Sequence, residues 1–318
     1  MYQRGRSEER SISIRKRFLS LALALALSLT LAVPALAVSV TEIPTEYEAG
    51  RMRFSDGMAR VTDENLKYGF IDKTGHLVIP CQYDDAGDFS EGFAWVQDES
   101  LKYGFIDKTG ALVVPCQYEY VSDFSEGLAY VANYAWSENR GRGYIDATGR
   151  MVISLPYAGG ADFSEGLAWA QDENFKYGFI DKTGKLVIPC QYDHAGDFSE
   201  GLAAVMDESG KWGFINKAGE LVIPFQYDVS GYALHFSEGL AAVMDESGKC
   251  GYIDKTGQLA IPFQFNDAGS FSEGLAAVMD ESGKCGYIDT AGNVAVPFQY
   301  DSIMHIDDDE FSDGVAAA

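Results

Sequence analysis

The chain has 318 residues and a formal net charge of −24, and 47% of its residues are hydrophobic and 13% aromatic. This apolar content is sufficient for a folded core and argues against intrinsic disorder. The negative charge disfavours nucleic-acid binding, which needs a basic surface, and docking on anionic membranes. Length alone predicts about two domains, and the 34 glycines indicate many turns.

The first 37 residues have the composition of a targeting segment. Basic residues gather between Arg4 and Arg17, an apolar run follows over 19–33, and small residues surround Ala37. This order predicts a secretory signal peptide cleaved near Ala37. A membrane anchor is the alternative, but the run is shorter than the ~20 residues of a spanning helix. We expect a secreted or cell-envelope-associated protein without a membrane span after cleavage, and an N-terminal lead-in over 38–53.

Residues 54–318 consist of tandem repeats. The tetrapeptide Phe-Ser-Asp/Glu-Gly recurs at intervals of 35 to 40 residues, and each interval contains one Gly-Phe/Tyr-Ile-Asp/Asn motif. A fixed period of this length is typical of a repeat array. The sequence therefore predicts one domain of seven repeats and a partial eighth, not two domains. The tetrapeptides begin at Phe54, Phe89, Phe124, Phe163, Phe198, Phe236, Phe271 and Phe311.

Each repeat is predicted to form a meander of three strands. In the fifth repeat these are residues 201–205, 211–215 and 221–223, separated by Gly-containing turns. Pro224 follows the third strand and is expected to end it, since proline cannot donate a ladder hydrogen bond. Three strands cannot bury a face alone, so neighbouring repeats should stack to form a continuous core.

The run Lys211-Trp212-Gly213-Phe214-Ile215, continued by Leu-Val-Ile-Pro and Gln-Tyr-Asp, resembles the WG-containing (KWG) repeat family. The resemblance covers roughly residues 47–315. It implies β-rich interaction modules, often in bacterial and secreted proteins, and it implies no catalytic residues. The namesake tryptophan is present only at Trp212, and the other repeats replace it by Tyr68, Tyr103, Arg142, Tyr177, Cys250 and Cys285.

The period of ~35 residues suits three-stranded repeats better than the four-stranded blades of a propeller. A surplus strand is predicted over 314–317, after the seventh repeat. An open, solenoid-like all-β array is therefore the preferred architecture. The alternative is a closed, seven-bladed, propeller-like ring.

One position in the Gly-Leu-Ala-x-Val strand divides the repeats into two groups. It is large in the first four repeats and alanine in the last three. Stacked repeats would align the large side chains into a ligand-binding stripe. We favour local packing over such a stripe, either across the hairpin onto Leu66, Leu101 or Phe175, or over the facing Gly104 and Gly178. The large residues are Arg60, Trp95, Tyr130 and Trp169.

Aspartates recur at the end of the second strand in six of the seven repeats, as in Asp72-Lys73-Thr74-Gly75, and again in the run from Asp84 to Asp88. Asp at such a position usually begins a turn, and neither stretch has the spacing of a known calcium loop. We therefore expect turn formation and no metal, with calcium binding as the alternative.

The five cysteines occupy positions where other repeats carry large apolar residues, which predicts buried thiols. Disulfides between neighbouring repeats, Cys81 with Cys116 or Cys250 with Cys285, are the alternative. No Cys-x-x-Cys pair indicates zinc.

No nucleophile motif or shared histidine position points to catalysis, and no cofactor is predicted. We expect an exported, non-catalytic scaffold that binds a protein or a cell-envelope glycan. One alternative is a carbohydrate-active enzyme that uses carboxylates of the repeat insertions, such as Glu138 and 307–309. The other is a calcium-stabilised adhesin.

Overall fold

A computed structural model describes residues 54–133, 141–156, 159–228 and 234–301, and the strands at 311–312 and 315–316. The chain divides into two compact units, Met1–Glu42 and Ile43–Ala318, and all described residues belong to the second. The predicted signal peptide, the lead-in and the insertion residues Glu138 and 307–309 lie outside the described residues. Within the described part, no helix is long and apolar enough to cross a membrane.

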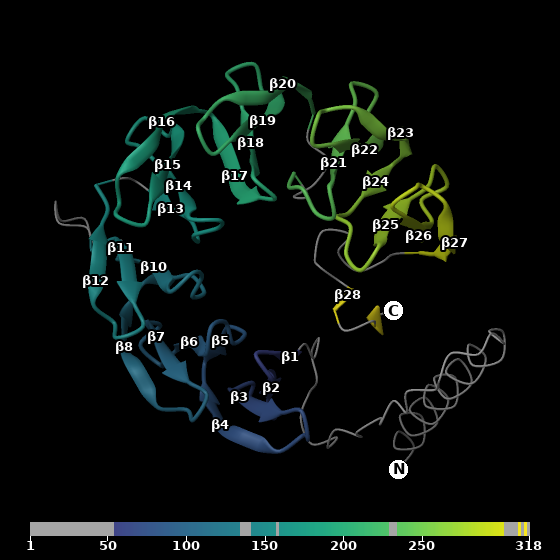
Figure 1. The fold of residues 1–318 in the computed structure, drawn as a ribbon. Coiled ribbons are helices and arrows are strands. Elements are labelled where there is room, and N and C mark those ends of the chain that lie inside the picture. The colour runs from purple at the N-terminus through teal and green to yellow at the C-terminus, as the bar shows by residue number, and fades with distance from the viewer. Residues whose placement is uncertain are drawn as a thin grey trace, which may run out of the picture. The chain divides into compact units, whose positions relative to one another are not determined.

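Seven antiparallel sheets follow one another in chain order (Figure 1), and we label them A to G. The strands of sheets A to C are β1(Phe54–Ser55), β2(Met58–Thr62), β3(Tyr68–Asp72) and β4(Leu77–Tyr83); β5(Asp85–Ala86), β6(Phe93–Gln97), β7(Tyr103–Asp107) and β8(Leu112–Tyr118); β9(Tyr120–Val121), β10(Leu128–Ala132), β11(Gly143–Asp146) and β12(Met151–Ser154).

The remaining sheets have the same order, and a short hairpin follows them. The strands of sheets D to G and the hairpin are β13(Gly159–Gly160), β14(Leu167–Gln171), β15(Tyr177–Asp181) and β16(Leu186–Tyr192); β17(His194–Ser199), β18(Leu202–Met206), β19(Trp212–Asn216) and β20(Leu221–Tyr227); β21(Leu240–Met244), β22(Cys250–Asp254) and β23(Leu259–Phe265); β24(Asp267–Ala268), β25(Leu275–Met279), β26(Cys285–Asp289) and β27(Val294–Tyr300); β28(Phe311–Ser312) and β29(Val315–Ala316).

The predicted all-β array of seven repeats is confirmed, and none of the described sheets closes into a barrel. The strand count differs from the prediction, because every sheet except F has a short first strand before the three predicted ones. Most of these first strands have two residues, too few to show the alternating pattern by which a strand is recognised. Whether the array is open or closed into a ring stays a prediction.

Pro224 does not end its strand, contrary to the sequence prediction. Strand β20 continues to Tyr227, and its pairing with β19 shifts between the pairs Phe214↔Ile223 and Trp212↔Tyr227. One residue of β19, Gly213, therefore faces three residues of β20. Proline is tolerated in such a bulge on an edge strand because its missing N–H has no ladder partner there.

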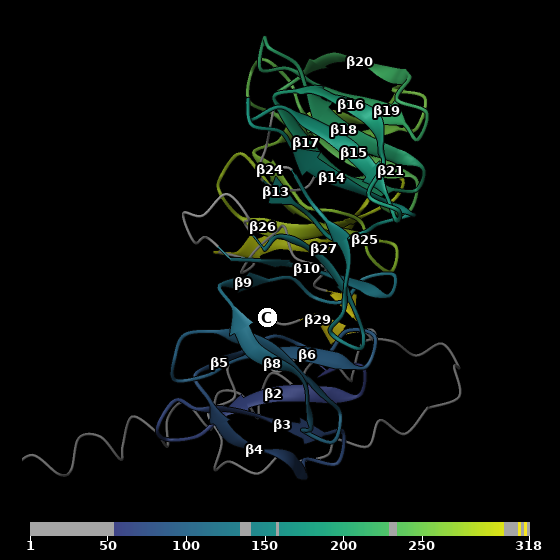
Figure 2. The same ribbon diagram turned by 90° about the vertical axis from the view of Figure 1, so that its left-hand side faces the viewer.

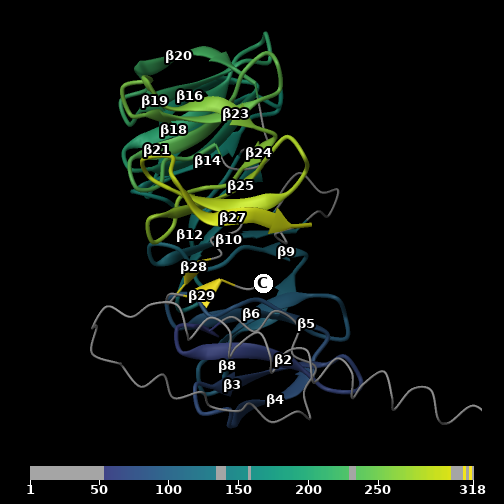
Figure 3. The ribbon, with the colours of Figure 1, turned by 90° about the vertical axis from the view of Figure 1, so that its right-hand side faces the viewer.

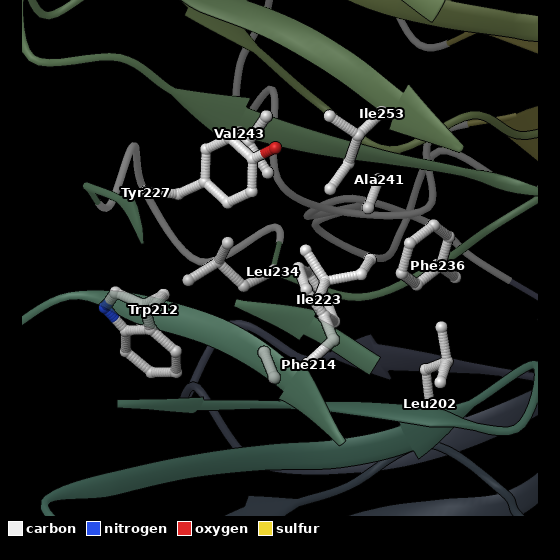
Figure 4. Packing of buried hydrophobic residues seen from close by; sticks show 11 residues of the cluster. Leu202, Trp212, Phe214, Ile223, Tyr227, Leu234, Phe236, Ala241, Val243 and Ile253 are labelled. Carbon is white, nitrogen blue, oxygen red and sulfur yellow. The ribbon is translucent and has the colours of Figure 1, made fainter. Parts of the chain in front are cut away.

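The hydrophobic cores lie between consecutive sheets. In Figure 4, Trp212 and Phe214 of sheet E and Tyr227 of its last strand share one cluster with Val243 and Ile253 of sheet F. Five other clusters likewise combine residues of two neighbouring sheets. The predicted stacking of repeats is therefore confirmed, and Figures 2 and 3 show the sheets from two further sides.

The Phe-Ser-Asp/Glu-Gly motif links each sheet to the next. Ser90 Oγ donates a hydrogen bond to the carbonyl oxygen of Phe124 at 2.7 Å, and the Glu91 carboxylate accepts one from the Gly127 N–H at 2.7 Å. Glu91 has a φ of 52°, unusual for a residue other than glycine, because it occupies a tight turn before β6. The serine bond recurs at Ser55, Ser125, Ser164, Ser199 and Ser237.

Candidate functional site

The large variable residues occupy one register position. Trp95 pairs with Phe105, Tyr130 with Tyr144 and Trp169 with Phe179, each between the second and third strands of its sheet. The structure therefore places them in equivalent positions, as the repeat alignment predicts. We call Trp95, Tyr130 and Trp169 the aromatic row.

Trp95 covers a glycine other than the predicted one. A Cβ atom built on Gly87 would lie 2.2 Å from the Trp95 indole nitrogen, so the ring lies directly over Gly87. The space above Gly104 is filled instead by the backbone of the last strand of the same sheet. The predicted cover of Gly104 by tryptophan is therefore wrong, because a bulge brings the neighbouring strand over this glycine.

The members of the aromatic row differ in exposure. Tyr130 is only 5% exposed, and its ring lies edge-on to Tyr144 at a centroid distance of 5.6 Å. It is a core residue, and its face is not available for stacking on a ligand. Trp95 and Trp169 are half-buried, so the ligand-binding hypothesis remains a prediction for these two rings.

Packing across the hairpin occurs, but onto other residues than predicted: Trp95 lies edge-on to Tyr103 and Trp169 to Tyr177, at ring-centroid distances of 5.5 and 5.2 Å. Leu66, Leu101 and Phe175 are 66%, 67% and 70% exposed, so they do not cover the large variable residues. Arg60 turns to its neighbours instead: its guanidinium lies 5.5 Å from the Tyr68 ring centre and donates to the Ala86 carbonyl.

Arg60 also reaches a row of carboxylates that sequence analysis did not identify as a site. Its Nε lies 3.8 Å from Asp88 Oδ1. Asp88 immediately precedes the Phe-Ser-Glu-Gly motif, next to the short first strand of sheet B. In sheet E this position lies in a β-bulge between Ala195 and Phe198. The equivalent residues of sheets B to E, which we call the Asp row, are Asp88, Asp123, Asp162 and Asp197.

The Asp row residues repel one another. Burial by the surrounding protein raises the pKa of Asp123 to about 6, and the charges of Asp162 and Asp88 add to this, whereas a hydrogen bond from the Trp95 indole lowers it. Burial and Asp162 likewise raise the pKa of Asp197 to about 6. Asp123 and Asp197 are nevertheless exposed to solvent, and Asp162 is half-buried, so neighbouring segments crowd the two outer carboxyls while solvent screens their charges.

Asp162 lies between the two. Burial raises the pKa of Asp162, and a hydrogen bond with Ser122 lowers it. Its Oδ1 atom is buried without a hydrogen-bond partner. A row of Asp residues before Phe in four consecutive repeats is visible in the sequence, but their mutual approach depends on how the sheets stack.

A shallow pocket of about 340 Å³ lies at the end of the Asp row. Asp197 and His235 line it, together with Ser164 and Ser199. The two serine hydroxyls donate to the carbonyl oxygens of Phe198 and Phe236, both at 2.6 Å. Both hydroxyl protons are thus engaged by backbone carbonyl oxygens, whereas the hydroxyl of an activated nucleophile donates to a general base.

The aspartates predicted at the ends of second strands lie at the ends of third strands, except in sheet F, because the other sheets have an additional first strand. They form turns, as predicted. Asp72 Oδ1 accepts hydrogen bonds from the backbone N–H groups of Thr74 and His76, at 2.8 and 3.1 Å. Hydrogen bonding, first from the Thr74 hydroxyl, lowers the pKa of Asp72. Among the described residues, no three His, Cys, Asp or Glu side chains gather in a way that could hold a metal ion.

All five cysteines are free thiols, so the alternative of inter-repeat disulfides is not realised. Cys250 and Cys285 are fully buried, which confirms the predicted burial of these two thiols. They belong to two different hydrophobic clusters. Cys81, Cys116 and Cys190 are half-buried. Burial raises the pKa of Cys116 to about 11, so that thiol stays protonated and unreactive at neutral pH.

The Asp row predicts an unusual pH dependence of stability. The folded-state pKa values of Asp123 and Asp197 lie above the unfolded value of 3.8, so the folded state binds these protons more tightly. These two groups therefore make their full contribution to the stability of the fold below about pH 4, and that contribution is lost as the pH rises through about 6. Asp123→Asn removes a charge that burial, and then the charges of Asp162 and Asp88, disfavour in the folded state. Because Asp123 is exposed and solvent screens its charge, we expect the melting temperature to rise by only about 2 °C near pH 7.5 and to change little near pH 4.5.

Asp207→Asn is the matched control. Hydrogen bonding, first from the Ser209 hydroxyl, lowers the pKa of Asp207, so its contribution is present at neutral pH and is lost on acidification. This variant should not raise the melting temperature near neutral pH. An equal rise for both variants would mean that net charge, and not the Asp row, limits stability.

A comparison with family models identifies seven consecutive matches over residues 68–318, each beginning near the second-last strand of one sheet and running into the next repeat. The matching model is described as WG containing repeat, and it matches residues 68–101, 103–133, 143–174, 177–212, 212–250, 251–285 and 286–318. The comparison with curated proteins finds no match.

Several solved structures resemble the chain at low identity. The computationally designed protein Ika8 is 11% identical over 77% of this chain and 84% of its own, with a TM-score of 0.49. BamB from Moraxella catarrhalis is 14% identical over 78% and 84%, with a TM-score of 0.44. Hsv2 from Kluyveromyces lactis is 8% identical over 74% and 91%, with a TM-score of 0.46.

Proposed function

This chain belongs to the WG containing repeat family, and from that premise we propose that it is an exported, non-catalytic scaffold that binds the basic segment of a partner protein along the Asp row. The observation that carries the proposal is the crowding of like charges in this row. Burial and the charges of neighbouring carboxylates raise the pKa values of Asp123 and Asp197, and burial raises that of Asp162, which marks a place where a cation would be stabilised.

Other acids of the repeats have cationic partners within the fold. Lys182 Nζ lies 2.8 Å from Glu126 Oε2, and Lys217 Nζ lies 3.0 Å from Glu165 Oε2. In the described part of the chain, Arg60 is the cation that reaches the Asp row: it lies at Asp88, and its charge also lowers the pKa of Asp123. The rest of the row is therefore suited to charges supplied by a ligand.

The aromatic row adds a preference for lysine and arginine. Trp95 donates its indole N–H to Asp123 and is half-buried, so its ring lies beside the carboxylate. A guanidinium or ammonium group can contact a carboxylate and an aromatic face at once, which strengthens its binding. This combination favours a basic peptide over a neutral glycan.

Export is the part of the proposal that rests on the sequence alone. The apolar run at 19–33 and the small residues before Val38 support cleavage near Ala37. The mature protein should therefore begin at Val38 when it is recovered from outside the cytoplasm and its N-terminus is sequenced.

Binding can be tested with short random peptides displayed on phage and selected on the mature chain. We expect enrichment of peptides rich in Lys and Arg. Their affinity should fall about tenfold or more for the triple variant Asp123→Asn, Asp162→Asn and Asp197→Asn, because three cation contacts are removed.

The matched control removes three charges from exposed turns, by Glu208→Gln, Glu220→Gln and Glu246→Gln, and should retain the affinity. Equal losses for both triple variants would reduce the effect to bulk charge and contradict the proposal. Binding of purified cell-envelope glycan that depends on the Asp row, without binding of basic peptides, would identify a glycan ligand instead.

A further inference from the structure

Three large apolar side chains lie exposed at equivalent turns. Leu66, Leu101 and Phe175 are 66%, 67% and 70% exposed, and each lies in the turn between the second and third strands of its sheet. We call these three residues the turn tips. They are separate from the Asp row, which lies beside the first strands.

The backbone conformation at the turn tips is unfavourable for their side chains. Their φ angles are 61°, 59° and 60°, in the left-handed region where a side chain other than glycine is strained. Sheets E, F and G have glycine at the same position, namely Gly210, Gly248 and Gly283, with φ of 77° to 79°. The same turn therefore forms without an apolar residue, and the fold does not require Leu or Phe there.

The turn tips are surrounded by negative charge. Asp63 and Glu64 precede Leu66, and the same acidic pair precedes Leu101 and Phe175 in the sequence. Hydrogen bonds within the turn, first from the Lys67 N–H, lower the pKa of Asp63. It therefore remains ionised.

The nearby lysine offsets this charge only in part, because the Lys67 ammonium group also pairs with Asp84 at 2.6 Å. Glu99, from the turn of sheet B, also helps to raise the pKa of Lys67, after Asp84. The turns of sheets A and B are therefore electrostatic neighbours, and each presents an exposed leucine beside acidic residues.

We propose that the turn tips dock a second protein whose surface has apolar pockets bordered by Lys and Arg. Leu66, Leu101 and Phe175 enter the pockets, and the acidic residues of the turns pair with the basic border. A second copy of this chain is a poor occupant, because the net charge of −24 would bring acid against acid. Anionic membranes are disfavoured for the same reason.

The test uses the triple variant Leu66→Gly, Leu101→Gly and Phe175→Gly. Because glycine adopts the left-handed conformation readily and the side chains are exposed, the melting temperature should be unchanged or higher. Phage-displayed peptides selected on the wild-type mature chain should include a class that combines apolar and basic residues. We expect this class to bind the variant about tenfold more weakly or worse.

Two further variants make the outcome decisive. Leu112→Ser, Leu221→Ser and Leu259→Ser remove apolar side chains that are 51%, 48% and 49% exposed on the last strands of their sheets, and they should leave this class bound. The triple Asp row variant should also bind this class of peptides. The result of this test is therefore independent of whether the proposed function is correct.

Selected peptides that bind the glycine variant as well as the wild type would overturn the docking surface. So would a large drop in its melting temperature, because the tips would then be structural. Binding to phosphatidylcholine vesicles that disappears in the glycine variant, without any tip-dependent peptide, would assign the tips to a lipid surface and equally reject the proposal.

Discussion

Replacing Phe198 by Ala is expected to lower the free energy of unfolding by about 4 kcal/mol, as for other fully buried Phe residues. Phe198 is 1% exposed, and its ring lies edge-on to Phe179 of the preceding sheet at a centroid distance of 4.9 Å. The substitution leaves a cavity between sheets D and E, where the two repeats have their shared core. Urea denaturation followed by circular dichroism measures the change.

Phe175→Ala is the control with the same chemical change. Phe175 is 70% exposed, so the expected change in stability is within about 0.5 kcal/mol. Because each repeat contacts only its neighbours, Phe198→Ala should also increase amide hydrogen exchange first in sheets D and E. A loss below about 1 kcal/mol for Phe198→Ala would contradict the inter-sheet packing.

The repeat pattern predicted the array because each recurrent residue has a local or nearest-neighbour partner. Phe198 recurs since it fills the space beneath the preceding sheet, and Ser164 recurs since its hydroxyl bonds the Phe198 carbonyl oxygen. Asp72 recurs since it accepts the hydrogen bonds of its own turn. Such partners lie at a fixed offset in the sequence, so periodicity alone is enough to indicate their structural role.

The Asp row could not be recognised as a cluster in the same way. Asp123 and Asp162 are 39 residues apart in the sequence, and their electrostatic contact arises only when sheets C and D stack. Sequence alone also could not separate exposed from buried aromatics. Tyr130 is buried and Trp95 is half-buried although they occupy one register position, because different neighbours surround them.

The two errors at the fourth strands have one physical origin. A bulge lets β20 pass through Pro224 and places the Ile223 carbonyl over Gly213. Rules for reading a sequence place the end of a strand at proline, and they place glycine in a turn or beneath a neighbouring aromatic side chain. Here Pro224 lies in the bulge and Gly213 makes room for it, so both residues allow the two backbones to approach closely. The pattern of apolar residues in one repeat gives no sign of this approach.

Gly213→Ala is therefore expected to be among the most damaging small substitutions, with a loss of about 3 kcal/mol in the free energy of unfolding. A Cβ atom at this position would lie 2.6 Å from the Ile223 carbonyl oxygen and 3.0 Å from the Phe225 amide nitrogen. Both are backbone atoms, so the methyl group can be admitted only if β19 and β20 move apart. Urea denaturation of the purified variant measures the loss.

Gly210→Ala, three residues earlier in the same sheet, separates this clash from the general effect of losing a glycine. Gly210 has a φ of 79°, and nothing lies within 4 Å of a Cβ atom built on it. Its substitution should cost only the conformational strain of about 1 kcal/mol, because Leu66 and Phe175 already carry side chains at this turn position. If the two alanine variants lose stability equally, backbone conformation and not the close approach of β19 and β20 explains the glycine that follows the Trp/Tyr position in each repeat.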